Sequence, residues 1–170
     1  MASLRPCQDT DLAALSLLVQ DFFNHHRQLK GNNEPMSLAE AEKICQEWYE
    51  RHPLLVYAET DRVIGFVRLR QEGDVYWIED IGVDQTERGQ GHGRAMLAAL
   101  EAYVQERGQD SLFVFVLPEN KKAIEFYVAN GYNILNMIEL RKDLAEASPA
   151  TAVTATGRNF NLEWKAGARK

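Results

Sequence analysis

The chain has little cysteine and proline, and it lacks long hydrophobic runs. Its 170 residues include five prolines and two cysteines, Cys7 and Cys45. Two cysteines far apart in the sequence fit neither a disulfide framework nor a metal site, so we expect buried thiols, no metal and a reducing cytoplasm. No stretch approaches the roughly 20 apolar residues of a membrane span. The N-terminus lacks the basic start of a secretory signal, so we expect neither secretion nor a membrane partner.

Basic residues are also scarce relative to acidic ones. Lysine and arginine number 19 against 25 aspartates and glutamates, which gives a net charge of −6. Phosphate backbones need a basic surface, so this balance argues against a nucleic-acid partner. A negative field would attract a cationic substrate, although solubility alone would also explain the charge.

The hydrophobic pattern predicts a mixed α/β sheet in one layered domain over residues 1–170, in the order βααβββαβαββ. Short polar turns between the second, third and fourth strands favour an antiparallel meander. We expect a loop at 146–158, strands at 4–7, 54–60, 63–70, 75–83, 112–117, 134–141 and 159–165, and helices at 12–23, 38–51, 91–107 and 120–130. The polar segment 25–35 should be a loop, and the capping-box spacing of Ser37 and Glu40 predicts the start of the second helix.

The most informative segment lies between the fourth strand and the third helix. A strand that ends at Val83 is followed by a polar loop and then by alternating glycines at the start of a helix. Glycine lets the backbone curl close to an anion, and a helix N-terminus supplies amide donors and the positive end of the helix dipole. The expected pyrophosphate-binding residues are Arg88, Gly89, Gly91, His92 through its backbone amide, Gly93 and Arg94.

Two other nucleotide-binding motifs fit this segment poorly. A Rossmann fingerprint that began at Gly89 would need glycine at Arg94, and one that began at Gly91 would need glycine at Met96. The Gly-Lys-Ser/Thr ending of a P-loop is absent. A glycine-rich connection with no ligand is the remaining alternative.

Arg88-Gly89-Gln90-Gly91-His92-Gly93 matches the Q/R-x-x-G-x-G/A signature of the GNAT acetyltransferases, and the chain resembles that superfamily. Phe126 to Tyr132 looks like the family's F-Y-x-x-x-G-F/Y segment, and Ile78 to Val83 resembles its bulged strand. The resemblance implies a GNAT-like domain that uses acetyl-CoA. It also implies that Ile81, Gly82 and Val83 hold the acyl arm and that Asn120 contacts CoA.

Acetyl transfer to an amine needs a base for the ammonium, donors for the developing oxyanion and an acid for the departing thiolate. Glu79 is our candidate base, since the Glu79-Asp80 pair resembles diamine acetyltransferases, and alternation along a strand directs Asp80 to the opposite face. The alternative is that Asp80 is structural, or that either acid is only the cross-strand partner of an arginine. A bulge at Gly82 would free backbone donors, unless glycine is present there only because a neighbour crowds it. Tyr127 is our candidate acid by its position in the family segment, with a core tyrosine as the alternative.

The expected acceptor is a primary amine of a small molecule such as a polyamine, an aminoglycoside or an amino-acid-like compound. A protein or peptide N-terminal acetyltransferase is the first alternative, and a non-catalytic acyl-CoA-binding module is the second. The strand at 159–165 is expected to pair within the chain or across a homodimer.

Overall fold

The computed structural model describes residues 2–60, 62–118 and 120–137. The chain divides into two compact units, Met1–Phe115 and Val116–Lys170. The predicted loop at 146–158 and the predicted last strand at 159–165 lie outside the described residues, so both stay predictions. In the part of the chain that is described, no helix is long and apolar enough to cross a membrane.

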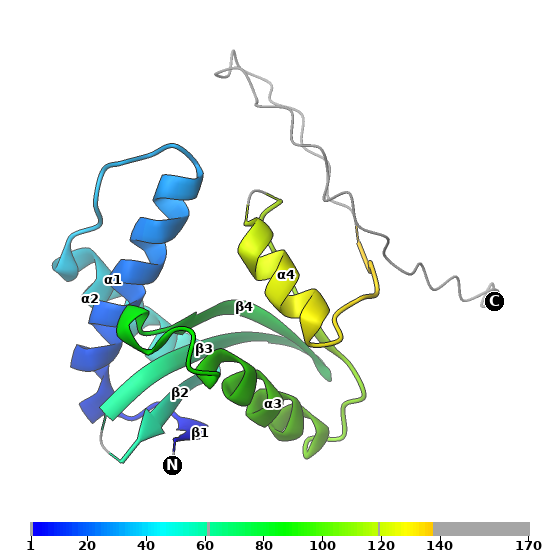
Figure 1. The fold of residues 1–170 in the computed structure, drawn as a ribbon. Coiled ribbons are helices and arrows are strands. Elements are labelled where there is room, and N and C mark those ends of the chain that lie inside the picture. The colour runs from blue at the N-terminus through cyan, green and yellow to red at the C-terminus, as the bar shows by residue number, and fades with distance from the viewer. Residues whose placement is uncertain (1, 61, 119, 138–170) are drawn as a thin grey trace. The chain divides into compact units, whose positions relative to one another are not determined.

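The first unit is built on a five-stranded sheet in the order β1-β2-β3-β4-β5 (Figure 1). The strands are β1 (Ser3–Pro6), β2 (Leu54–Glu59), β3 (Arg62–Glu72), β4 (Val75–Val83) and β5 (Leu112–Val114). The first four pair antiparallel, and β5 pairs parallel to β4. The predicted meander is therefore confirmed. β2 and β3 each contain five consecutive buried residues, which suits strands that are covered by helices on both faces.

The same unit has three α-helices and two short 3-10 helices. They are η1 (Asp9–Asp11), α1 (Leu12–Leu29), α2 (Leu38–Arg51), η2 (Gln85–Glu87) and α3 (His92–Gln105). The predicted capping box of α2 is confirmed: the Glu40 amide donates to Ser37 Oγ at 3.2 Å, and the Ser37 amide donates to the Glu40 carboxylate at 2.7 Å. These bonds satisfy amides that a helix start leaves without intrahelical acceptors.

α1 and α2 cover one face of the sheet, and α3 covers the other (Figure 1). Phe66 on β3 is fully buried and contacts Phe22 of α1 and Trp48 of α2, with ring centroids 5.5 Å and 6.1 Å away. The adjacent Gly65 faces the sulfur of Met96 on α3. Successive residues of a strand point to opposite faces, so this alternation divides the core into two layers.

The first helix is longer than predicted. The sequence favoured a loop from His25, but α1 continues to Leu29. Residues after Phe23 lack apolar periodicity, yet a helix already formed by buried residues propagates at one hydrogen bond per added residue. Side chains of α1 then hold the returning chain: Asn24 Oδ1 accepts from the Met36 amide at 2.7 Å, and Gln20 Nε2 donates to the Met36 carbonyl at 2.9 Å.

β5 is shorter than the predicted strand at 112–117, because its ladder with β4 covers only Tyr76–Ile78 and Leu112–Val114. In the second unit, α4 (Lys121–Ala129) begins one residue after Asn120 and is followed by Gly131 at a φ of 95°. Of the strand predicted at 134–141, Ile134 forms an isolated bridge and 135–137 are not in a strand. The rest of that strand lies outside the described residues.

Candidate active site

β4 has a strand neighbour on the β5 side along only part of its length. Tyr76–Ile78 pair with β5, but β4 continues to Val83, and no strand among the described residues pairs with that last part on the β5 side. The ladder between the two strands therefore ends before Ile81 and Val83. Strand edges expose backbone donors and acceptors, so this edge is suited to an extended ligand with amide groups.

The bulge of β4 lies at Glu79 and not at Gly82, where the sequence favoured it. Arg68 of β3 is opposite Asp80 and Leu69 is opposite Ile78, which leaves Glu79 as the extra residue. Gly82 pairs regularly with Phe66. A Cβ atom on Gly82 would be 2.7 Å from Phe66 Cε1, so crowding by a neighbour explains this glycine.

The bulge brings the two carboxylates to the same face of the sheet. We expected Asp80 to face away from Glu79, but the side chain of Arg68 contacts both, with Nη2 3.5 Å from Glu79 Oε2 and 2.5 Å from Asp80 Oδ2. Arg70 Nε also donates to Glu79 Oε1 at 2.7 Å. An extra residue in one strand changes the alternation, which is why strict two-residue periodicity was wrong here. Burial raises the pKa of the Asp80 carboxyl, and Arg68 opposes that rise.

Aromatic rings support both arginines. The guanidinium of Arg68 lies 4.7 Å from the ring centroid of Trp48, and that of Arg70 lies 4.3 Å from Trp77 and 5.5 Å from Phe115. Such contacts are favourable and fix the plane of the cation. The sequence left open that either acid is the cross-strand partner of an arginine, and both are, but it did not indicate which arginines. Their spacing of two residues on β3, opposite an acidic pair on β4, was the available signal.

The glycine turn has the predicted strand–loop–helix context. α3 begins at His92, one residue later than predicted, and Gly91 is its N-cap. Gly89 and Gly91 have φ values of 79° and 87°, and a Cβ atom on either would meet nothing within 4 Å. Glycine is therefore required by backbone conformation and not by lack of space. The first amides of α3 have no intrahelical acceptor and are suited to an anion.

A network around Glu87, which sequence reasoning also missed, holds this turn. Arg62 Nη2 lies 2.6 Å from the Glu87 carboxylate, Gln90 Nε2 donates to it at 3.1 Å, and His92 Nε2 is 3.6 Å away. Arg88 Nε donates to the Val83 carbonyl at 3.1 Å. These contacts join the end of β4, the turn and the start of α3.

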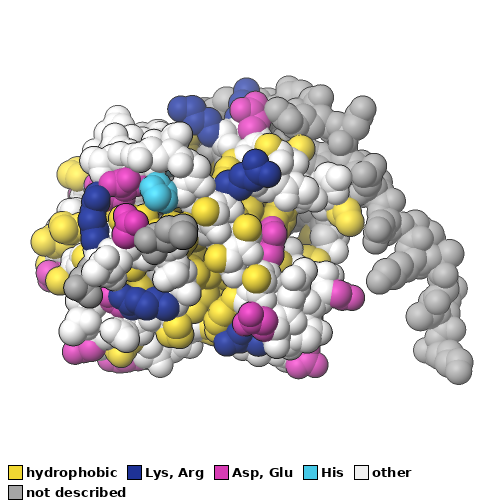
Figure 2. Space-filling view, turned by 60° about the horizontal axis from the view of Figure 1, so that its bottom comes forward, with side chains coloured by type: hydrophobic (Ala, Val, Ile, Leu, Met, Phe, Trp, Pro, Cys, Tyr) yellow, Lys and Arg dark blue, Asp and Glu magenta, His cyan; other side chains and the backbone are white. Residues whose placement is uncertain are grey.

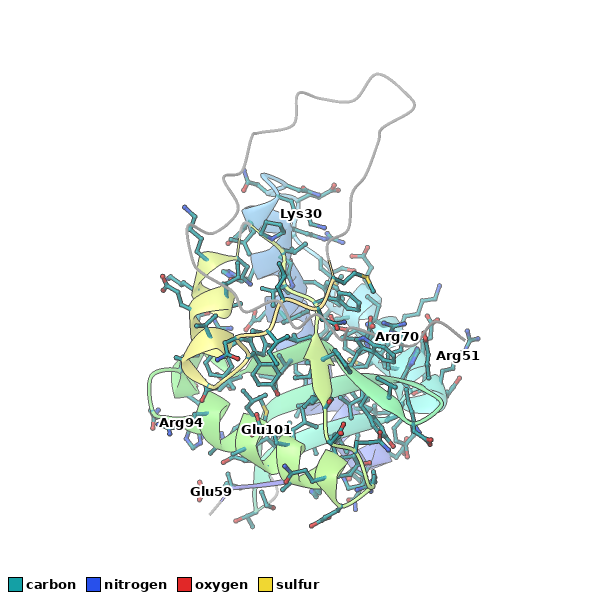
Figure 3. All side chains as sticks on the ribbon, turned by 90° about the vertical axis from the view of Figure 1, so that its right-hand side faces the viewer. Lys30, Arg51, Glu59, Arg70, Arg94 and Glu101 are labelled. Carbon is teal, nitrogen blue, oxygen red and sulfur yellow. The ribbon has the colours of Figure 1, made fainter. Side chains whose placement is uncertain are left out.

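Arg94 is exposed on the first turn of α3, as Figure 3 shows, with Glu101 further along the same helix. The half-buried Gly93 precedes it in the same turn. The side chain of Arg94 is therefore open to solvent beside the amides at the helix start, where it could contact a bound phosphate.

Asn120 and Tyr127 lie in the second unit. The side-chain oxygen of Asn120 accepts from the Ala123 amide at 3.2 Å, so this residue caps α4. Tyr127 contacts the rings of Phe126 and Tyr132, with centroids 5.3 Å and 5.4 Å away. The first unit brings together Glu79, the Ile81–Val83 edge and the glycine turn. The roles of Asn120 and Tyr127 stay predictions.

The two thiols are placed as predicted. Cys7 and Cys45 are both buried and free. Burial raises the pKa of the Cys7 thiol to about 12 and also raises that of Cys45, so neither is an activated nucleophile. Within residues 2–60, 62–118 and 120–137, no group of three or more His, Cys, Asp or Glu side chains could hold a metal ion.

Comparison with known proteins identifies the family. The chain is 27% identical over 138 residues to mycothiol acetyltransferase of Propionibacterium freudenreichii subsp. shermanii. The aligned region covers 76% of this chain and 42% of that protein. It spans less than half the length of each mycothiol acetyltransferase that it matches.

Two solved structures show the same fold. Aminoglycoside N-acetyltransferase AAC(6')-Iy in complex with CoA has a TM-score of 0.64 at 15% identity, over 85% of this chain and 96% of that chain. The Escherichia coli ribosomal-protein-S18-alanine N-acetyltransferase has a TM-score of 0.59 at 24% identity, over 77% of each chain. Residues 18–132 match the model of the acetyltransferase (GNAT) family. The chain therefore belongs to the acetyltransferase (GNAT) family.

Proposed function

We propose that this protein transfers an acetyl group from acetyl-CoA directly to a primary amine of a small molecule. The observation that carries the proposal is the glycine turn at the start of α3, which directly follows the part of β4 that has separated from β5. One end of this arrangement suits a diphosphate, and the other suits an extended amide chain. Acetyl-CoA has both features in the same order.

The acetyl-CoA site uses backbone groups more than side chains. The amides at Gly89, Gly91 and the first turn of α3 bind the pyrophosphate, and Arg88 and Arg94 add charge. The β4 edge at Ile81–Val83 binds the pantetheine amides and directs a donor at the thioester oxygen. The amide nitrogen of Asn120 is a further donor to CoA, since its oxygen caps α4.

The chemistry needs one nucleophilic attack, a base for the amine and an acid for the departing thiolate. Glu79, through a water, removes a proton from the acceptor ammonium, whose pKa starts at about 10.4. The amine nitrogen attacks the thioester carbon, the C–N bond forms and the C–S bond breaks. Tyr127 gives its proton to the departing sulfur, and the nitrogen loses its second proton to solvent. The tyrosinate then takes up a proton from solvent and Glu79 releases one, which restores both residues. The products are the acetamide and CoA thiol.

A small cationic acceptor is favoured by the charge of the protein. The net charge is −6, and acidic and basic side chains are interspersed on the face shown in Figure 2. Two carboxylates, Glu79 and Asp80, share the face of the bulge. Relatives named for mycothiol and a structural neighbour named for aminoglycosides agree with a small-molecule amine. A homodimer and a cytoplasmic location are further predictions.

The experiment is a thiol-release screen with acetyl-CoA over polyamines, aminoglycosides, amino-sugar thiols, amino acids and short peptides, accompanied by calorimetry. Binding of acetyl-CoA with turnover of a small amine is the expected result. Turnover of peptides alone would instead favour a protein N-terminal acetyltransferase. Binding without thiol release from any acceptor would indicate an acyl-CoA-binding module, and no binding would refute the proposal.

A further inference from the structure

We propose that Arg68 is a positioning residue for the transfer step, which holds both carboxylates of the β4 bulge on one face of the sheet. The inference rests on the proposed function for the identity of the reacting groups. The contacts of one guanidinium with Glu79 and Asp80 can be tested on the protein without any substrate.

Arg68 contacts both carboxylates from the neighbouring strand. Its Nε and Nη2 atoms lie 2.6 Å and 2.5 Å from the same oxygen, Oδ2 of Asp80, and Nη2 lies 3.5 Å from Oε2 of Glu79. The side chain of Arg68 is 17% exposed, that of Asp80 is 11% exposed and that of Glu79 is 24% exposed. Charged hydrogen bonds at this level of burial are stronger than surface pairs.

The ring of Trp48 stacks on the guanidinium of Arg68. The centre of the Arg68 guanidinium is 4.7 Å from the Trp48 ring. Trp48 is buried and packs against Phe66 and Phe23, with ring centroids 6.1 Å and 5.9 Å away. The orientation of Arg68 is therefore set by the packing of α2 on the sheet. A lysine could keep the charge but could not reproduce the planar fork or the stacking.

The bulge makes such a cation necessary. Adjacent residues in a regular strand point to opposite faces, but here Glu79 and Asp80 both reach Arg68. Two carboxylates on one face repel each other, and burial already raises the pKa of Asp80. The charged groups that face Asp80 are Arg68 from β3, Glu79 from its own strand and His52 at the end of α2. Without Arg68, Asp80 would be protonated at a higher pH or would turn away.

Arg70 is not equivalent to Arg68. It donates to Glu79 and pairs with Glu72 at the end of β3, and no contact between Arg70 and Asp80 is found among the described residues. Arg68 alone therefore joins the two members of the bulge. This difference predicts that a variant of Arg68 changes the protonation of Asp80, whereas a variant of Arg70 leaves the protonation of Asp80 unchanged.

The test compares Arg68→Lys with Arg51→Lys, a surface control whose side chain is 68% exposed. For the best acceptor, we expect Arg68→Lys to lower kcat at least about tenfold while the acetyl-CoA Kd changes less than about twofold. The acid limb of the pH profile should move up by about one unit, since the nearby cation that favours the carboxylate is displaced. The control should match the wild type. An unchanged kcat and pH profile in Arg68→Lys would overturn the inference.

A second measurement keeps the inference testable if no amine is turned over. Carbon-13 NMR titration of the Asp80 carboxyl, assigned with Asp80→Asn, should show a higher pKa in Arg68→Lys than in the wild type. The same pKa in both proteins would overturn the inference without bearing on acetyl transfer. If Arg68→Lys does not fold, Trp48→Phe keeps the charge and weakens the stacking. That variant should give a smaller shift in the same direction, and no shift would also overturn the inference.

Discussion

The ring of Phe66 occupies the space beside Gly82 that a larger residue would need for its side chain. The two residues are directly opposite each other on β3 and β4, and Phe66 Cε1 is 2.7 Å from the position of a Cβ atom on Gly82. Phe66 is fully buried and contacts Phe22 of α1, so its ring cannot move without disturbing the core. Glycine at position 82 therefore leaves room for the ring of Phe66, on which α1 packs.

Gly82→Ala should therefore destabilise the fold by about 1–3 kcal/mol, the usual cost of overpacking a core. Urea denaturation of the single variants Gly82→Ala and Phe66→Leu and of the double variant measures this. Because the smaller leucine makes room for the alanine methyl, the double variant should lose less stability than the sum of the single variants. Strict additivity would mean that the two side chains do not compete for the same space.

Gly89→Ala or Gly91→Ala should weaken acetyl-CoA binding at least about tenfold, because an L-residue disfavours the left-handed backbone by about 1–2 kcal/mol and the turn would rearrange. Calorimetry measures the affinity. Gly73→Ala is a matched control, since Gly73 has a φ of 58° and no atom within 4 Å of its Cβ position, but it lies in the β3–β4 turn. It should lose similar stability and keep its affinity. Equal affinities in all three variants would remove the turn from the proposed site.

Tyr127→Phe should lower kcat by about 10²-fold or more if the phenol protonates the departing thiolate. The Kd for acetyl-CoA should change little, because the ring is retained. Tyr132→Phe is the matched control, since Tyr132 lies in the same segment and its ring is 5.4 Å from that of Tyr127. Steady-state kinetics and calorimetry separate the two effects. Unaltered turnover in Tyr127→Phe would exclude it as the acid.

Asp11 should make a pH-dependent contribution to stability. Hydrogen bonds from Arg5 lower the pKa of its carboxyl, helped by the Gln8 amide. A lowered folded-state pKa means that the stabilisation is present above the unfolded pKa of about 3.9 and is lost as the pH falls through the folded value. Asp11→Asn should cost about 1–3 kcal/mol at neutral pH.

Denaturation from pH 7 down to about pH 2 measures the difference in unfolding free energy between wild type and Asp11→Asn, and that difference should shrink at the acid end. Asp9→Asn, at an exposed neighbouring position, should have little effect at any pH. A difference for Asp11→Asn that stays constant down to about pH 2 would contradict the assignment.

Local chemistry made the order of elements from β1 to α4 and the glycine turn predictable from the sequence alone. The spacing of Ser37 and Glu40 predicted a helix start, and β4 runs from Val75 to Val83 as its residues indicated. The conformation of the glycine turn also followed, because the positive φ values of Gly89 and Gly91 and the amides of a helix start are properties of the local backbone.

Only the tertiary structure decided which side chains meet across the sheet. One extra residue in β4 at Glu79 turned Asp80 to the same face and brought both carboxylates to Arg68, while Phe66 gave Gly82 a packing role. A bulge has no characteristic sequence, because it forms where one strand has an extra residue relative to its partner. A clash between two strands depends on residues that are far apart in the chain, so local sequence does not reveal it. The sequence therefore determined the glycine turn at the start of α3, and packing between strands determined that Glu79 and Asp80 meet at Arg68.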